Sequence, residues 1–148
     1  MRPDDGARLQ RFVAGLSENS RYQRFMQHLH EIPPALVERF TRVDGRREVA
    51  LVVGDPGHGE FVAVGRFAPI PGTSNAEFAL VVADAWQHRG LGRALLERLC
   101  RAARAAGYAA LHGYVLADNR DMIQLAAKLG FTPVERDGAA LVLSRQLK

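Results

Sequence analysis

The six residues Gln87-His88-Arg89-Gly90-Leu91-Gly92 stand between an apolar strand and a long helix. The strand is predicted over residues 77–82 and the helix over about 91–106. A glycine-containing turn that opens a helix leaves several backbone N–H groups without an acceptor, and the positive end of the helix dipole reinforces them. The stretch therefore predicts a binding site for a di- or polyphosphate group.

The spacing of the glycines excludes two familiar phosphate-binding loops. The nucleotide-triphosphate loop requires Lys and then Ser or Thr after its last glycine, whereas Gly92 is followed by Arg93 and Ala94. The dinucleotide fingerprint requires three glycines, and only Gly90 and Gly92 are present. On spacing alone, a tight strand-to-helix turn without a ligand is an equal alternative.

Two further motifs follow in order. A predicted strand over 110–116 leads to Asp118-Asn119-Arg120-Asp121-Met122, and residues 125–131 (LAAKLGF) then close a helix before the next strand. Together with the glycine turn, which fits a Gln/Arg-x-x-Gly-x-Gly/Ala pattern, these motifs resemble the GCN5-related N-acetyltransferase (GNAT) superfamily. The resemblance extends from about Ser17 to the end of the chain.

Three other segments narrow the resemblance: residues 17–25 (SENSRYQRF), 43–52 (VDGRREVALV) and 76–79 (AEFA). They are similar to the acetyltransferase domains of bacterial protein lysine acetyltransferases of the Pat type. In those enzymes the domain is often fused to an acyl-CoA-synthetase-like or a cyclic-nucleotide-binding region, and these 148 residues contain neither. The resemblance therefore says more about the fold than about the substrate or regulation.

Capping residues predict three helices ahead of the first strand. Asp4 is expected to cap the first helix, and Ser20 with Gln23 to form a capping box that opens a second helix through about His30. Pro33-Pro34 suits the first turn of the third. The residues expected to face inward are Leu9, Phe12, Val13, Leu16, Leu36, Val37 and Phe40.

The order of all elements indicates a mixed α/β fold. Strands are predicted near 48–53, 60–67, 77–82, 110–116, 132–135 and 140–145, and a helix opens at Asn119. This order predicts the GNAT fold in one domain over 1–148, with a mixed, mostly antiparallel central sheet and helices on both faces. Family members usually begin with an edge strand, of which Arg2-Pro3 resembles a remnant. A shortened protein and a fragment are both open, and the exposed edge could pair with another chain.

Composition excludes several other classes. The charge of +4 and pI of about 9.8 suit an anionic ligand, but the arginines are scattered and no aromatic-basic interleaving indicates nucleic-acid binding. No apolar run approaches the roughly 18–20 residues that span a bilayer, and no signal peptide is apparent. A single cysteine, Cys100, expected to be buried, favours a cytoplasmic location. The five histidines form no metal-ligand spacing, so no metal is predicted.

The resemblance implies direct transfer of an acetyl group from acetyl-CoA to a primary amine in a ternary complex. Backbone N–H groups from Arg89 to Arg93 would hold the pyrophosphate, and main-chain groups of the preceding strand would pair with the pantetheine arm. Asn119 matches a position that contacts the cofactor near its thiol, with a helix-capping role as the alternative. The expected cofactor-binding residues are Val81, Val82, Gln87, His88, Arg89, Gly90, Leu91, Gly92, Arg93 and Asn119.

Glu77 is the expected general base, because it matches the glutamate given that role in Pat-type domains. Neutralising a lysine of pKa about 10.4 at pH 7 costs about 4.6 kcal/mol, so burial or a relaying water would have to help an ordinary glutamate. The alternative for Glu77 is a solvated carboxylate at the end of a strand. Glu60 and Asp84 are weaker candidates. The tyrosine that many members use as general acid aligns with Ala126, so that residue is absent.

Three functions remain open for this chain. The Pat-type segments favour acetylation of a protein lysine, with an acyl-CoA synthetase as one candidate partner. The alternatives are a small-molecule amine acceptor and a non-catalytic module that senses acyl-CoA. Residues 18–34 and 69–75 are expected to shape the acceptor pocket, and the oligomeric state is open.

Overall fold

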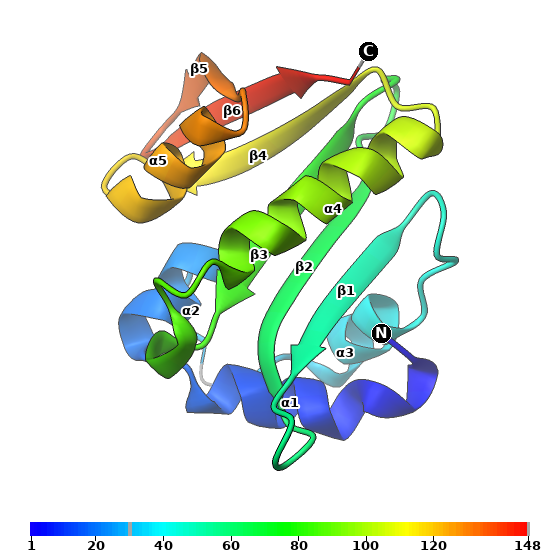
Figure 1. Cartoon of the computed structure of the whole chain (residues 1–148), viewed down its shortest axis with the longest axis vertical. Coiled ribbons are helices and arrows are strands. Elements are labelled where there is room, and N and C mark those ends of the chain that lie inside the picture. Colours follow the sequence, from blue (N-terminus) through cyan, green and yellow to red (C-terminus); the bar gives the residue numbers. More distant parts are fainter. Residues whose placement is uncertain (30, 148) are drawn as a thin grey trace.

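The computed structural model describes residues 1–29 and 31–147, which form a six-stranded sheet with helices on both faces (Figure 1). The strand order is β1-β2-β3-β4-β6-β5; β3 and β4 are parallel, and the other neighbours are antiparallel. This confirms the predicted mixed α/β GNAT fold. The strands are β1 (Val49–Gly54), β2 (Phe61–Pro69), β3 (Ala76–Val82), β4 (Ala110–Leu116), β5 (Thr132–Asp137) and β6 (Ala140–Gln146). The helices are η1 (Pro3–Asp5), α1 (Gly6–Gly15), α2 (Glu18–Phe25), α3 (Pro34–Thr41), η2 (Asp84–Trp86), α4 (Leu91–Ala105) and α5 (Arg120–Lys128).

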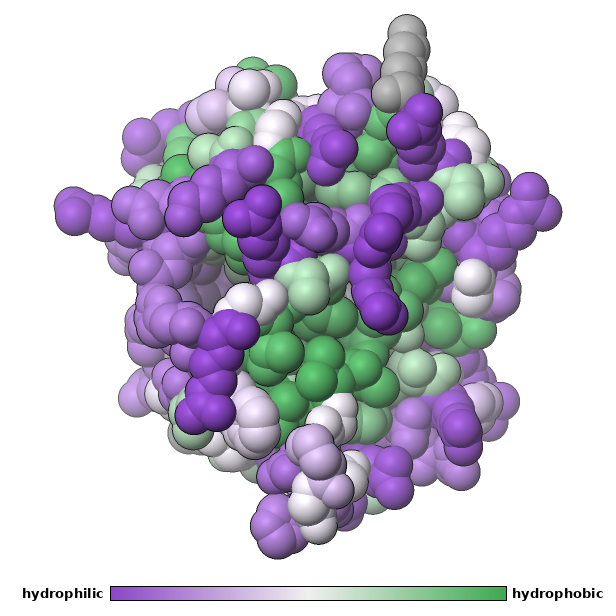
Figure 2. All heavy atoms as spheres, in the orientation of Figure 1, coloured by the Kyte–Doolittle hydropathy of each residue, from purple (hydrophilic) through white to green (hydrophobic). Residues whose placement is uncertain are grey.

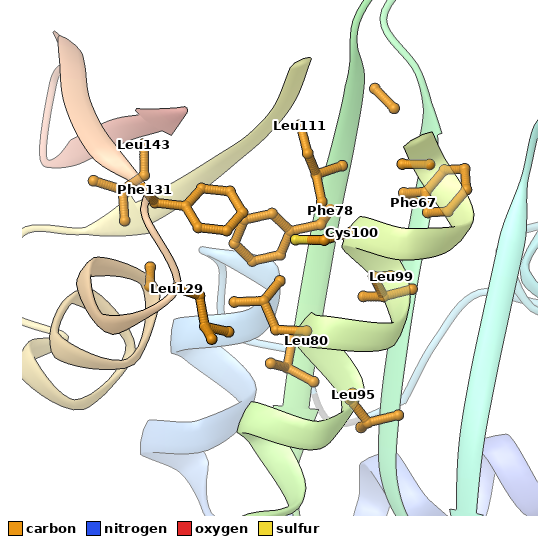
Figure 3. Close-up of a cluster of buried hydrophobic side chains, with 14 of the residues drawn as sticks. Phe67, Phe78, Leu80, Leu95, Leu99, Cys100, Leu111, Leu129, Phe131 and Leu143 are labelled. Atoms are coloured by element: carbon orange, nitrogen blue, oxygen red, sulfur yellow. The ribbon is translucent and has the colours of Figure 1, made fainter. Parts of the chain in front are cut away.

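Two apolar cores lie on opposite faces of the sheet because strand side chains alternate in direction. On the face seen in Figure 1, Phe67, Phe78 and Leu80 pack with Leu99 of α4, and this core continues under α5 (Figure 3). On the other face, Val64 of β2 packs with the buried residues of α1. The inward-facing residues predicted for α1 are all buried there, and those predicted for α3 pack against them.

The caps of the first two helices differ from the prediction. Asp4 caps nothing; α1 begins after Asp5, whose carboxylate accepts the N–H of Arg2 at 2.7 Å. The cap of α2 is Ser17 rather than Ser20, because the Ser17 hydroxyl accepts the N–H of Ser20 at 3.1 Å. Helix α2 ends at Phe25, where Met26 adopts a left-handed conformation (φ 57°), well before His30, which lies outside the described residues.

Strand β1 lies at one edge of the sheet. Its inner neighbour is β2, and on its outer side the Met1 amino group donates to the carbonyl of Ala50 at 3.2 Å. Helix α4 crosses β2 and β3, so Leu51 and Val53 of β1 are only partly covered. Figure 2 shows apolar atoms in the middle of this face, surrounded by polar side chains.

Cys100 is buried on α4, as expected, and burial raises the pKa of its thiol. Across residues 1–29 and 31–147, every helix is too short or too polar to cross a membrane.

Candidate active site

The two central parallel strands separate halfway along their length. Strands β3 and β4 are paired only from Ala76 to Phe78, opposite Leu111 to Gly113. At the last pair, a Cβ on Gly113 would stand 2.3 Å from the Phe78 ring, so only glycine lets that ring lie across β4. The ring of Phe131 meets the Phe78 ring edge to face at 5.3 Å (Figure 3). The end of β3 is therefore left without β4 beside it.

Main-chain groups of β3 become available where the strands separate. The N–H of Ala83 donates to the Val62 carbonyl at 2.8 Å, so by alternation the main chain of Val81 faces β2. The groups of Leu80 and Val82 face the opposite side, where β4 has turned away. The Val82 carbonyl accepts a hydrogen bond from the Gln87 side chain at 3.0 Å. Leu80, which the sequence analysis did not select, therefore joins Val82 as a candidate partner for an extended ligand.

A cavity of about 440 Å³ occupies the space between the separated elements. Its walls come from α2, the end of β3, the turn after η2, the first turn of α4, and α5. Most of the predicted cofactor residues line it together: Val81, Val82, Gln87, His88, Gly90, Leu91, Gly92, Arg93 and Asn119. Arg89 is not part of this lining, because its guanidinium lies over the Trp86 ring at 5.0 Å.

The first turn of α4 presents backbone amides to this cavity. Gly90 is the N-cap residue with φ 84°, and it makes no side-chain cap, so the N–H groups of the first turn have no capping acceptor. Such a terminus attracts an anion. The two glycines serve different purposes. Gly90 provides the left-handed conformation, whereas a Cβ on Gly92 would stand 3.2 Å from Leu125 of α5, so Gly92 allows the helices to approach closely.

Charged side chains around the turn have partners within the protein. His88 lies 3.7 Å from the Asp121 carboxylate, and Arg93 donates to Glu97 at 3.0 Å on the same helix.

Asn119 has the capping role that was the alternative for it, and its contact with the cofactor stays a prediction. Its side-chain oxygen accepts the N–H of Met122 at 3.3 Å, which makes it the N-cap of α5. It also lines the cavity. The cap fixes the side-chain oxygen, which leaves the amide NH₂ group as the part able to reach a ligand.

Glu77 lies outside the cavity lining, on the other face of β3. Its neighbours Ala76 and Phe78 point into the core under α4, so the Glu77 side chain points the opposite way and reaches solvent. Surrounding atoms still crowd it, and this partial desolvation raises its pKa above the ordinary value, while the positive charges of Arg24 and His112 oppose the rise. His112 stands directly beside it on β4.

The other two carboxylates weighed as bases are engaged elsewhere. Glu60 forms an exposed bidentate ion pair with Arg11, at 2.9 and 3.0 Å. Asp84 accepts the N–H and hydroxyl of Ser17 and the hydroxyl of Ser20. These bonds fasten α2 to the turn that leads into α4.

Helix α2 supplies cavity residues that sequence reasoning did not select. Ser20, Gln23 and Arg24 line the wall opposite α5, within the segment expected to shape the acceptor pocket. Lys128 lines the cavity from the end of α5. The spacing of the polar residues in α2 could have indicated a polar face on this helix. Nothing in the sequence shows which strand that face will meet.

Among the described residues, no tyrosine lines this cavity. Ala126, at the position of the absent tyrosine, is fully buried in the core. The Tyr108 hydroxyl donates to the carbonyl of Arg47 at 2.8 Å, and Tyr114 is 40% exposed on β4. Within the described part of the chain, no three His, Cys, Asp or Glu side chains cluster in a way that could hold a metal ion.

Comparisons with known proteins agree with this geometry. A model of the Acetyltransferase (GNAT) family matches residues 16–131. The acetyltransferase PA5475 of Pseudomonas aeruginosa is 31% identical over 133 residues, covering 88% of this chain and 72% of that protein. The GNAT domain of S. lividans PAT has a TM-score of 0.90 at 31% identity, covering 99% of this chain and 88% of that one. The structure of yncA from Salmonella typhimurium, which holds its cofactor acetyl-CoA, has a TM-score of 0.74 over 100% of this chain and 91% of its own, and at 19% identity it supports the fold alone.

Proposed function

Because this chain belongs to the GNAT family of acetyltransferases, with acetyl-CoA as acyl donor, we propose that its acceptor is a lysine side chain of another protein. The similarity of its sequence to Pat-type domains supports this choice, as does the match to the GNAT domain of S. lividans PAT.

Two sets of main-chain groups suit two parts of acetyl-CoA. The uncapped amides of Gly90 to Arg93 suit its pyrophosphate, and the main chain of Leu80 and Val82 suits its amide-bearing arm, as an added strand would. When bound, acetyl-CoA supplies an activated acetyl thioester. The Leu80 and Val82 amides would then stabilise negative charge that develops on the carbonyl oxygen.

Glu77 receives the proton that the acceptor ammonium must lose. A raised pKa brings this carboxylate closer to the ammonium in proton affinity, and its exposure leaves room for a relaying water. The free amine then forms the new C–N bond as the C–S bond breaks. The thiolate of CoA departs without an acid at the position of Ala126, and it takes up the second proton, which the new amide nitrogen releases.

The observation that favours a macromolecular acceptor is the open approach to Glu77. The side chain reaches solvent on a strand surface beside the exposed Tyr114, rather than at the bottom of an enclosed pocket. A lysine extended from a protein surface can reach such a position, whereas a small amine gains little contact area there.

The test is acetylation of candidate acyl-CoA synthetases, compared with a panel of small amines, by the wild type and by Glu77→Gln. We expect mass spectrometry to find acetyl-lysine on a protein substrate, and the variant to be slower by about a hundredfold or more. A small amine acetylated more efficiently than every protein would contradict the proposed acceptor. Tight binding of acetyl-CoA without turnover would favour a sensing module instead.

A further inference from the structure

Among the residues that the structure describes, Arg24 of α2 has no hydrogen-bond or ion-pair partner, and it stands in the wall of the cavity. Arg24 lines the cavity, and its guanidinium lies 4.7 Å from the ring centre of Phe25 and 5.6 Å from that of Phe40. Among residues 1–29 and 31–147, no carboxylate lies within ion-pair distance of it and no acceptor satisfies its N–H groups. The five N–H donors of an arginine are therefore available to a ligand.

A second arginine adds positive charge at the same place. Arg66 of β2 is only 7% exposed, lies 4.1 Å from the centre of the same Phe40 ring, and donates to the Phe40 carbonyl at 3.4 Å. Burial, together with the charge of Arg66, lowers the pKa of Arg24 to about 10, and burial lowers that of Arg66 to about 10, so both stay protonated near neutral pH. Glu77 is the carboxylate that acts on Arg24, and Glu48 the one that acts on Arg66.

This arrangement has a consequence for an amine acceptor. An ammonium group that approaches Glu77 enters the field of Arg24, which repels it unless the acceptor also carries negative charge. Stacking on two aromatic rings holds the long side chain of Arg24 in place, so binding an anion costs it little conformational entropy. A guanidinium presents paired N–H groups that match a carboxylate.

We infer that Arg24 binds a carboxylate carried by the acceptor, close to the amine that Glu77 deprotonates. This inference rests on the proposed amine acetylation and adds the chemical class of its acceptor. The carboxylate has two sources, an Asp or Glu side chain beside the target lysine of a protein, or the carboxyl group of a free amino acid. The donor's phosphates have a separate place at the start of α4, on another wall of the cavity.

The test compares acceptors that differ only in one carboxylate. The peptide pair contains one lysine flanked by Glu in one member and by Gln in the other. The small pair is Nα-acetyl-lysine and Nα-acetyl-lysinamide. For the wild type we expect kcat/KM to favour the carboxylate member of at least one pair by about tenfold, mostly through KM. The pair that shows the preference identifies the source.

Arg24→Gln should reduce that preference to about one, with the KM for acetyl-CoA unchanged. The ratio is measured within one variant, so a loss of folded protein cancels out. Arg39→Gln is the matched control, since it removes an exposed charge of α3 near Arg66 but outside the cavity, and it should keep the preference. Arg24→Lys keeps the charge without the paired donors and should retain only part of it.

Two results would overturn the inference while acetyl transfer itself still stands. One is an equal rate for both members of each pair in the wild type. The other is a preference that survives in Arg24→Gln, with or without a higher KM for acetyl-CoA. A wild-type protein that binds acetyl-CoA and acetylates none of the acceptors would instead overturn the proposed function, and the inference with it.

Discussion

Glu77 lies near the start of β3 and Asp84 just beyond its end, and their surroundings shift their pKa values in opposite directions. Desolvation raises the pKa of Glu77. Partial burial acts on Asp84 in the same way, but the hydrogen bonds from Ser17 and Ser20 outweigh it and hold its pKa below the ordinary value. The same functional group is therefore better suited to accept a proton in one place, and anchors α2 in the other.

The raised pKa of Glu77 predicts the acid limb of the pH-rate profile. The carboxylate accepts a proton only when ionised, so kcat should fall as the pH falls through a pKa above the usual value of about 4.3. Because Arg24 lowers the pKa of Glu77, Arg24→Gln should move this limb to higher pH. Profiles of kcat at saturating acceptor check this; an unmoved limb in Arg24→Gln would contradict it.

The lowered pKa of Asp84 predicts a pH-dependent contribution to stability. A carboxylate whose pKa is depressed in the folded state stabilises it above the unfolded-state pKa, and this contribution disappears as the pH falls through the folded-state value. Asp84→Asn should therefore cost about 1 kcal/mol at pH 7, a low value because the side chain is exposed. The difference from wild type should shrink below about pH 4. Urea unfolding at several pH values measures it, with the exposed Asp4→Asn as control.

The elements around the cavity depend on glycines for two different reasons. Gly90 supplies a backbone conformation at the start of α4, and Gly113 leaves space for an aromatic ring between β4 and the core. Each can be tested by adding one methyl group.

Gly90→Ala should weaken acetyl-CoA binding. A non-glycine residue at φ 84° is strained by about 1 kcal/mol, and relief of that strain would move the amides of the first turn of α4. We expect the KM for acetyl-CoA to rise severalfold. Gly138→Ala in the β5–β6 turn has a similar requirement at φ 60° but lies away from the cavity, so it should lower stability without changing that KM.

Gly113→Ala should destabilise the junction of β3 and β4. Its Cβ would overlap the Phe78 ring, and overpacking of this kind costs about 1–3 kcal/mol. Phe78→Leu removes the overlapping ring atoms. The double variant should therefore lose less unfolding free energy than the two single variants lose together. Equilibrium unfolding of the four proteins measures this coupling; simple additivity would show that the ring does not fill the space of the missing side chain.

Two apolar cores lie on opposite faces of a sheet that opens between β3 and β4. The cavity is bounded by α4 and α5 on one face and by α2 on the other, while Glu77 is reached from the face of α2. A ligand in the cavity would thus connect α2 with α4 and α5, which lie on opposite faces of the sheet.

Acetyl-CoA should therefore stabilise the whole protein against unfolding. At a hundred times its Kd the gain is about 2.7 kcal/mol, and hydrogen exchange should slow at the end of β3 and the starts of α4 and α5. Pantetheine at equal concentration should stabilise less, because it lacks the pyrophosphate for the α4 amides. Equal stabilisation by both compounds would contradict a role for those amides.

Local patterns determined most of the secondary structure. The motif at 87–92, the helix it opens and the strand at 110–116 were predicted almost to the residue, because glycine conformation, apolar periodicity and helix ends are short-range effects. The caps at Asp4 and Ser20 were wrong because several polar residues in a row offer equally good caps, and tertiary contacts choose among them. Asp84, far along the chain, draws both Ser17 and Ser20 into place.

The donor could be expected from the sequence through the resemblance to the family, whereas the local motif by itself predicted only a phosphate site at a helix start. The acceptor side could not, because Arg24, Arg66 and Glu77 come from three elements whose closeness depends on packing. The opening between β3 and β4 could not be predicted either, because it requires Phe78 to cross over Gly113, a contact between distant segments. Periodicity decides which face a side chain occupies, but only the packed sheet decides which other side chains it meets there.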